Sequence, residues 1–114
     1  MAPSELFDIR KELWIRSFEK ALPFEQFIAS GAPAHQERWK GYADKISLSP
    51  DQLKIAGEFK RRMRVLVLAG TWCGDCARQC PMIEAIGKAS SVVEVRYIDN
   101  QSDEQLRDEL RIHG

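Results

Sequence analysis

Two cysteines stand two residues apart in the most clearly patterned stretch of this sequence. Cys73 and Cys76 follow an apolar run over residues 65–69 and precede a segment with helical spacing. Backbone N–H groups at a helix start have no partners within the helix, and they favour a thiolate placed there. We therefore expect Cys73 to be nucleophilic and Cys76, one turn further on, to close a disulfide with it. Such a pair is the minimal equipment for thiol–disulfide exchange.

A third cysteine, Cys80, lies four residues after Cys76 and on the same face of the predicted helix. It is a candidate third thiol or metal ligand, although a buried apolar role is favoured, because reactivity requires exposure and a lowered pKa. Cys-x-x-Cys pairs also hold zinc or iron–sulfur clusters, so a metal-binding module is an alternative. That module needs a fourth ligand, for which the chain offers His35 and His113. We assign neither a metal nor any other cofactor.

Two residues near the pair are expected to modify it. A carboxylate at Asp75 disfavours the Cys73 thiolate and opposes the effect of the helix start, so the pair should be more reducing than a strongly oxidising Cys-x-x-Cys pair. The alternative role for Asp75 is to cap the helix. Pro81 falls inside the predicted helix, where it removes a backbone donor and predicts a kink.

The composition excludes several classes of function. The chain of 114 residues carries 17 basic and 17 acidic side chains, so its net charge indicates neither nucleic acid nor an anionic membrane as a partner. No apolar stretch reaches the ~20 residues of a membrane span, and the first residues do not resemble a secretory signal. Three clustered cysteines are too few for a disulfide scaffold. We expect a soluble, cytoplasmic chain with one modest core.

The first part of the chain is predicted to be helical. Apolar residues recur at helical spacing between Ser4 and Pro23. A shorter helix is expected over residues 24–30, before a break at residues 31–33. Residues 34–43 place Trp39 in a polar setting that is compatible with a helix.

The middle of the chain contains a strong helix start. Residues 45–48 alternate as a short strand would, and Ser49, Pro50 and Asp51 then supply a cap, a first-turn proline and a first-turn acid. The apolar pattern extends this helix to Met63. The basic residues at 60–64 then fall at its C-terminal end, where the helix dipole favours cations, so we do not interpret them as a nucleic-acid site.

The second half is predicted to alternate strands and helices. Residues 65–69 are nearly all apolar, which is typical of a central strand buried on both faces. The helix after the cysteines should bury the side chains that recur with its period: Cys76, Cys80, Ile83 and Ile86 or Gly87. Residues 92–98 form the next strand, with Val93, Val95 and Tyr97 on one face, and a final helix follows Ser102.

From residue 45 onward this order predicts an α/β fold with a parallel sheet and right-handed crossovers. The run from Trp72 to Cys76, Trp-Cys-Gly-Asp-Cys, with Pro81 five residues later, resembles the thioredoxin superfamily. More narrowly, it is similar to bacterial thioredoxin-family proteins that add a further Cys-Pro and a helical N-terminal extension. The resemblance implies an extension over residues 1–44 and a thioredoxin-like domain, with a partial parallel sheet flanked by helices, over residues 45–114.

The resemblance also implies a function and a role for each site residue. Cys73 would attack a disulfide in a protein or small-molecule substrate, and Cys76 would resolve the mixed disulfide. A separate reductase would supply electrons, so the full-length protein would be a protein-disulfide reductase. The alternative is a thioredoxin-like interaction domain without catalysis. The residues expected to bind substrate or shape the site are Trp72, Gly74, Asp75 and Pro81.

Three departures from the thioredoxin pattern stand out. Val67 occupies the place of a buried acid and Val95 the place of its lysine partner, so the usual proton relay to the resolving cysteine should be missing. The cis-proline loop that faces the cysteines in the family is expected beyond Gly114. A sheet without its outer strands would leave the edge at residues 65–69 unpaired, which predicts a tendency to form homodimers.

Overall fold

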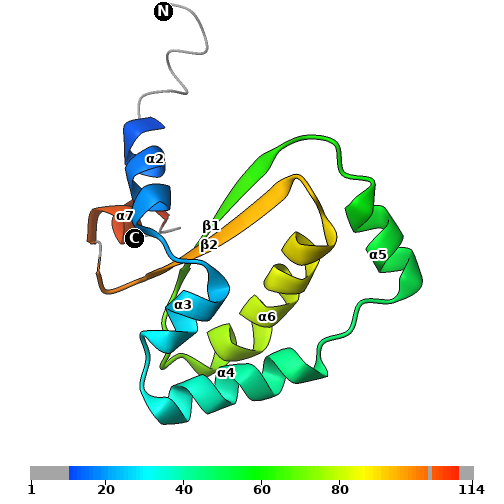
Figure 1. Cartoon of the computed structure of the whole chain (residues 1–114). Helices are drawn as coiled ribbons and strands as arrows, with labels where there is room; N and C mark the ends of the chain where they lie inside the picture. The colour runs from blue at the N-terminus through cyan, green and yellow to red at the C-terminus, as the bar shows by residue number, and fades with distance from the viewer. Residues whose placement is uncertain (1–10, 103, 111–114) are drawn as a thin grey trace, which may run out of the picture.

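The computed structural model describes residues 11–102 and 104–110. Figure 1 shows two long strands side by side with helices around them, which is the mixed α/β class expected from the sequence. The elements, in chain order, are α2 Lys11–Lys20, α3 Phe24–Ala29, α4 Pro33–Lys45, α5 Pro50–Gly57, β1 Met63–Ala69, α6 Gly74–Ala89, β2 Val93–Asp99 and α7 Glu104–Leu110. The part of the predicted first helix that precedes Lys11 lies outside the described residues.

The sheet consists of β1 and β2, which run parallel and are joined by α6. Val65 is paired with Val95 and Val67 with Tyr97. On the other edge of β2, Leu22 forms an antiparallel bridge to Tyr97, with both N···O distances at 2.7 Å. β2 is therefore bonded on both sides, whereas no strand among the described residues pairs with the outer edge of β1.

Two predictions about strands are wrong. The predicted strand at residues 45–48 does not form, because α4 continues to Lys45 and Ser49 already caps the next helix, so only a short linker remains between them. The strand after it was expected to be central and buried on both faces. β1 instead lies at an edge, and its middle residues are half-buried.

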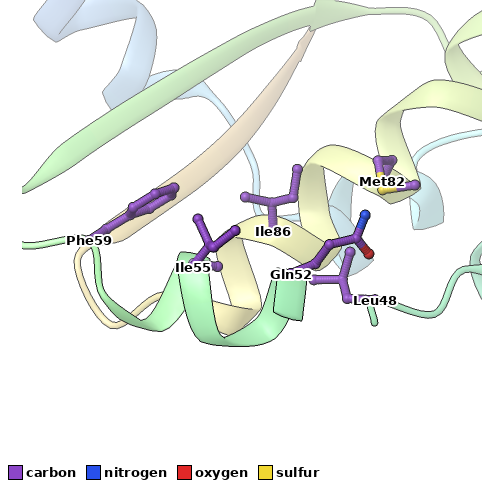
Figure 2. A pocket seen from close by; sticks show the side chains of 7 residues that line it. Leu48, Gln52, Ile55, Phe59, Met82 and Ile86 are labelled. Atoms are coloured by element: carbon purple, nitrogen blue, oxygen red, sulfur yellow. The ribbon is translucent and has the colours of Figure 1, made fainter. Parts of the chain in front are cut away.

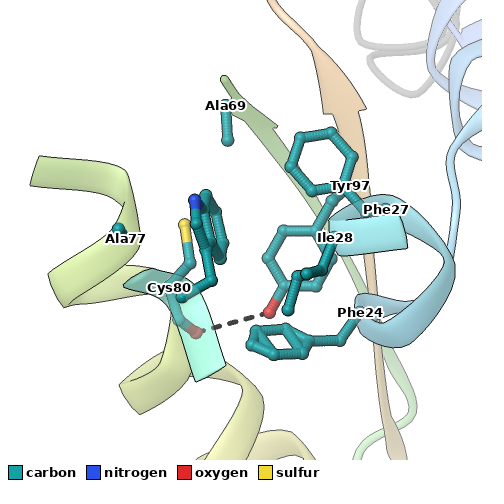
Figure 3. Close-up of a cluster of buried hydrophobic side chains, with 8 residues drawn as sticks. Phe24, Phe27, Ile28, Ala69, Ala77, Cys80 and Tyr97 are labelled. Atoms are coloured by element: carbon teal, nitrogen blue, oxygen red, sulfur yellow. Dashed lines mark hydrogen bonds between the residues drawn. The ribbon is translucent and has the colours of Figure 1, made fainter. Parts of the chain in front are cut away.

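The alternation of side chains along the strands creates a separate apolar cluster on each face of the sheet. The larger cluster joins α3, α4 and α6 to the strands (Figure 3). Its buried members are Phe24, Phe27, Ile28, Trp39, Ala69, Ala77, Cys80 and Tyr97. The smaller cluster lies on the opposite face and contains Ala21, Ile98 and Leu106, with Leu66 and Leu68 packed against it. The prediction that Val95 and Tyr97 lie on one face is confirmed.

Helices α3 and α4 share their core with the second half of the chain. Phe24 makes edge-on ring contacts with Trp39 and Tyr97, with ring centroids 6.0 and 5.4 Å apart. Burying aromatic side chains of this size is a major source of folding free energy. The domain boundary expected at residue 44 stays a prediction, but α3 and α4 pack as part of the core that supports β2 and α6.

Helix α5 begins as predicted and ends earlier. The Ser49 hydroxyl accepts a hydrogen bond from the Gln52 backbone N–H, and the Gln52 side-chain oxygen accepts one from the Ser49 N–H, which forms a capping box. The helix ends at Gly57, and Met63 begins β1. The predicted extension of this helix to Met63 is therefore wrong. The basic residues at 60–64 lie in the connection between α5 and β1 and at the start of β1, not at a helix end.

The buried face of α6 agrees with the prediction in part. Cys80 and Gly87 are buried as predicted, while Cys76 and Ile83 are half-buried. Ala77 and Pro81, which the periodicity did not single out, are also buried. A Cβ at Gly87 would lie 2.8 Å from a Val95 methyl group, so the close approach of α6 to β2 requires glycine there. Ile86 is consequently turned outward, where it is 38% exposed.

Ile86 lines an apolar groove between α5 and α6 (Figure 2). The other side chains that line this groove are Leu48, Gln52, Ile55, Ala56, Phe59 and Met82. None of the three cysteines is among them, so the groove is separate from the candidate redox site. Within residues 11–102 and 104–110, no helix has the length and apolar character needed to cross a lipid bilayer.

Candidate active site

The cysteine pair lies where β1 passes into α6. β1 ends at Ala69, a tight turn follows, and Cys73 is the N-cap of α6. The Cys73 N–H donates to the Gly70 carbonyl oxygen at 3.0 Å, and the Cys73 carbonyl accepts from the Ala77 N–H at 3.0 Å. The predicted sequence of strand, turn, cysteine pair and helix is therefore the arrangement in the structure.

The Cys73 thiol is half-exposed, and its surroundings favour the charged form. The backbone N–H of Cys76 and then the Cys76 thiol lower the pKa of Cys73 below its ordinary value, and the backbone N–H of Asp75 adds to this effect. Unpaired amides at the first turn of a helix stabilise a thiolate in this way. Cys73 is thus suited to be the attacking thiol.

Cys76 differs from Cys73 in its environment. Burial raises the pKa of Cys76, and the neighbouring Cys73 sulfur raises it further. Val67 and Val95, at the positions where the resemblance places an acid and a lysine, pack with Cys76 against the larger cluster. The apolar surroundings of Cys76 therefore favour its protonated form, whereas the helix start favours the ionised form of Cys73.

Cys80 is enclosed in the larger apolar cluster and is only 4% exposed. Burial raises the pKa of Cys80 to about 12, which favours the inert, apolar role. Within the described ranges, no group of three or more His, Cys, Asp or Glu side chains is placed to hold a metal ion. The geometry of the cysteines thus gives no support to the zinc or iron–sulfur alternative, and His113 lies outside the described residues.

Asp75 lies on the exposed side of the first turn of α6. Its carboxylate forms an ion pair and hydrogen bond with Arg78, and both side chains are exposed. The Asp75 charge raises the pKa of Cys73, as predicted, but it is the smallest of the named causes. The N-cap residue Cys73 makes no side-chain capping hydrogen bond, and the hydrogen bond of the Asp75 carboxylate is to Arg78, so the capping role considered for Asp75 is not observed.

The remaining predicted site residues lie around the pair in different ways. Trp72 is 46% exposed beside Cys73, and its indole covers Gly70 so closely that a Cβ there would lie 2.7 Å from the ring. Gly74 is exposed and is the first residue of α6, and the Arg38 guanidinium lies 3.9 Å from the position its Cβ would take. Pro81 is buried within α6, and the kink expected there stays a prediction.

Trp39 is the site residue that the sequence did not reveal. Its side chain is fully buried, and its indole Nε1 donates a hydrogen bond to the Thr71 carbonyl oxygen at 2.8 Å. Thr71 lies in the turn that leads to Cys73. The polar pattern of residues 34–43 did not indicate that Trp39 contacts the turn. The one available signal was that a buried tryptophan needs an acceptor for its N–H.

A second unpredicted group lies deeper along α6. The Tyr97 hydroxyl lies 3.2 Å from a Glu84 carboxylate oxygen and 3.4 Å from the Cys80 carbonyl oxygen, and Figure 3 shows the latter bond. Burial raises the pKa of both Tyr97 and Glu84. These contacts satisfy the Tyr97 hydroxyl, which lies in the larger cluster.

A parallel α/β unit with a cysteine pair at a strand-to-helix turn defines the class of thioredoxin-like proteins. A family model described as thioredoxin matches residues 21–114, so the chain belongs to the thioredoxin family. The match includes α3 and α4 as well as the strands. No curated protein matched the sequence.

Two solved structures share this fold. One is a protein of unknown function from Pseudomonas aeruginosa, with 21% sequence identity and a TM-score of 0.73 over 84% of this chain. The other is an HIV epitope-scaffold, with 20% identity and a TM-score of 0.75 over 88% of this chain. This chain spans 60% and 63% of their respective lengths. At these identities the likeness concerns the fold alone.

Proposed function

We propose that this protein is a thiol–disulfide oxidoreductase that acts through Cys73 and Cys76. The observation that supports this proposal most strongly is the opposite environment of the two thiols. The half-exposed Cys73 has a lowered pKa at the start of α6, whereas burial raises the pKa of Cys76. An accessible thiolate beside a protonated thiol is the arrangement that disulfide exchange requires.

The exchange proceeds in two balanced steps. The Cys73 thiolate attacks one sulfur of a substrate disulfide, forms a mixed disulfide and releases the other substrate sulfur as a thiolate. Cys76 then loses its proton and attacks the Cys73 sulfur, which releases the second substrate thiolate and leaves a Cys73–Cys76 disulfide. The substrate gains two electrons and two protons, and a separate dithiol reductant or reductase returns the pair to its reduced form.

The surface beside Cys73 suits a substrate that offers apolar and backbone groups next to its disulfide. The exposed indole of Trp72 supplies a flat apolar platform, and amphipathic rings of this kind are effective contact surfaces. We propose protein or small-molecule disulfides as substrates, and no nucleic acid or membrane partner. A reducing role of this kind fits a reducing compartment, and we propose the cytoplasm.

The test is to equilibrate the protein with defined mixtures of reduced and oxidised dithiothreitol and to measure the state of each cysteine by mass spectrometry of its peptides. We expect a Cys73–Cys76 disulfide that forms and breaks reversibly while Cys80 stays a thiol. The reduced protein should then accelerate the reduction of insulin disulfides. Failure of the pair to form a disulfide at any potential, or pairing through Cys80 instead, would overturn the proposal.

A further inference from the structure

We propose that Trp39 of α4 is a positioning residue for the redox pair. Its indole holds the turn between β1 and α6 so that the Cys73 sulfur stands in front of the first amides of α6. This inference concerns the geometry of the turn, and it rests on the proposed function only for its effect on disulfide exchange.

The contact between Trp39 and the turn is direct and buried. The indole Nε1 donates to the Thr71 carbonyl oxygen at 2.8 Å across 32 residues of sequence. Trp39 itself is fixed by Phe24 and Phe27, whose ring centroids lie 6.0 and 5.7 Å from its own. A donor held by two rings in a packed core has little freedom to move, so the position of the Thr71 carbonyl is set by α4.

A second contact holds Thr71 from its side chain. Gly31, in the connection between α3 and α4, approaches so closely that a Cβ there would lie 2.7 Å from the Thr71 Cβ and 2.8 Å from its hydroxyl oxygen. The Gln36 side chain donates to the Gly31 carbonyl oxygen at 2.9 Å and ties that connection to α4. Thr71 is therefore held at its carbonyl by Trp39 and at its side chain by Gly31.

The held residue is coupled to the reactive sulfur through a short stretch of backbone. Thr71 lies within the turn that the hydrogen bond from the Cys73 N–H to the Gly70 carbonyl closes. Rotation of the peptide after Thr71 would move Cys73 relative to the N–H groups of Cys76 and Asp75, which stabilise its thiolate. The charged or titratable groups near this sulfur are Cys76 and Asp75 on α6, while Arg38 of α4 approaches Gly74.

The first test is Trp39→Phe, which keeps an aromatic ring and removes the N–H donor. Site-resolved alkylation of Cys73 by iodoacetamide is measured against pH, since the rate follows the thiolate fraction. We expect the rate at pH 7 to fall by roughly threefold or more, which corresponds to a rise of about half a pKa unit, with the plateau at high pH unchanged. Ile28→Val is the matched control, because it loosens the same cluster but leaves the Trp39 N–H and its ring contacts with Phe24 and Phe27 in place.

The second test avoids any change in the core aromatic residues. Gly31→Ala should push Thr71 and shift the Cys73 profile in the same direction. Gly41→Ala is its control, because Gly41 lies within α4 and a Cβ there has no neighbour within 4 Å. Circular dichroism and the melting temperature establish that each variant is folded at the temperature of the assay.

The outcomes separate positioning from packing. If Trp39→Phe and Gly31→Ala lower the melting temperature but leave the Cys73 profile equal to that of their controls, Trp39 is a packing residue and the inference is wrong. The assay detects the Cys73 thiolate without any disulfide substrate. A shifted profile in a protein that fails to reduce insulin would therefore support this inference and contradict the proposed function.

Discussion

Cys73 and Cys80 are the same residue type at two places along one helix, and their chemistry differs greatly. Cys73 stands before the first amides of α6 and is half-exposed, and its pKa is lowered. Cys80 lies two turns further on inside the larger apolar cluster, and burial raises its pKa to about 12. The helix start supplies N–H donors that the helix interior has already used for its own hydrogen bonds.

Position in the fold, rather than residue type, sets the environment of each thiol and the direction of its pKa shift. Cys76 lies between the two extremes: burial raises its pKa, yet it remains close enough to Cys73 to lower the pKa of that thiol. A gradient of burial along α6 thus separates the three thiols, and in the proposed function Cys73 attacks, Cys76 resolves and Cys80 stays structural.

Replacing Cys73 and replacing Cys80, each by itself, should show the difference between these two thiols most clearly. Cys73→Ala should reduce insulin reduction to the background rate, a loss of more than about a hundredfold, because no other accessible thiolate replaces it. Cys80→Ala should retain nearly the full rate, at the cost of a small loss of core packing. Equal losses in the two variants, with both proteins folded, would show that Cys80 takes part in turnover.

Alkylation rates at pH 8 should distinguish Cys73 from Cys80 without any substitution. The thiolate fraction of Cys80 at this pH is about one in ten thousand, given its pKa of about 12. The higher intrinsic nucleophilicity of such a thiolate offsets part of this difference, while burial restricts access to it. We expect Cys73 to react at least ~50-fold faster than Cys80 in peptide-resolved alkylation, and comparable rates would contradict the difference in environment.

The pH dependence of folding stability tests the environment of Glu84, which follows Cys80 on α6. Burial raises the pKa of Glu84 above its ordinary value of 4.5, so the folded state binds its proton more tightly than the unfolded chain does. Its contribution to stability is therefore greatest below pH 4.5 and is lost as the pH rises through the raised value.

Glu84→Gln keeps an oxygen acceptor for the Tyr97 hydroxyl and removes the charge. Because Glu84 is partly exposed, we expect a gain in the free energy of unfolding at pH 7 of less than about 1 kcal/mol, after allowance for solvent screening. Urea unfolding at pH 4 and pH 7 measures it. A variant that is less stable than the parent at pH 7 would show that the carboxylate is favourable where it lies.

Asp75→Asn, close to the half-exposed Cys73, should produce the smallest change in reactivity. The substitution removes a nearby charge that disfavours the Cys73 thiolate and releases Arg78 from its ion pair. Both effects lower the pKa of Cys73, so alkylation at pH 7 should accelerate, by less than about threefold because the carboxylate is exposed and screened. Slower alkylation in this variant would reverse the sign that we assign to Asp75.

The local part of this architecture was predictable from the sequence. The turn and helix start at Cys73, the Ser49 cap of α5 and the faces of the second strand follow from short-range patterns that the structure retains. Cys80 was correctly favoured as buried, since it shares a helical period with other apolar residues.

The contacts between distant segments were not predictable in the same way. Trp39 lies in a polar helix, and its acceptor at Thr71 is 32 residues away, so no local period reports the contact. The apolar run of β1 was expected to be a central strand, because hydrophobicity predicts burial but does not identify the neighbouring strand. In the structure, the additional bridge, from Leu22, is to the outer edge of β2 and not to β1. Local sequence patterns thus predicted where the cysteine pair lies, whereas the residues that hold it in place could be identified only from the structure.

The most direct test of the account is to trap the mixed disulfide. A Cys76→Ala variant removes the resolving thiol, so attack on a disulfide substrate should stop at a covalent adduct. Mass spectrometry of the variant incubated with intact insulin or a small aromatic disulfide then locates the adduct. We predict an adduct on Cys73 that forms faster as the pH rises toward the pKa of that thiol. An adduct on Cys80, or none in a folded variant, would contradict the assignment of Cys73 as the nucleophile.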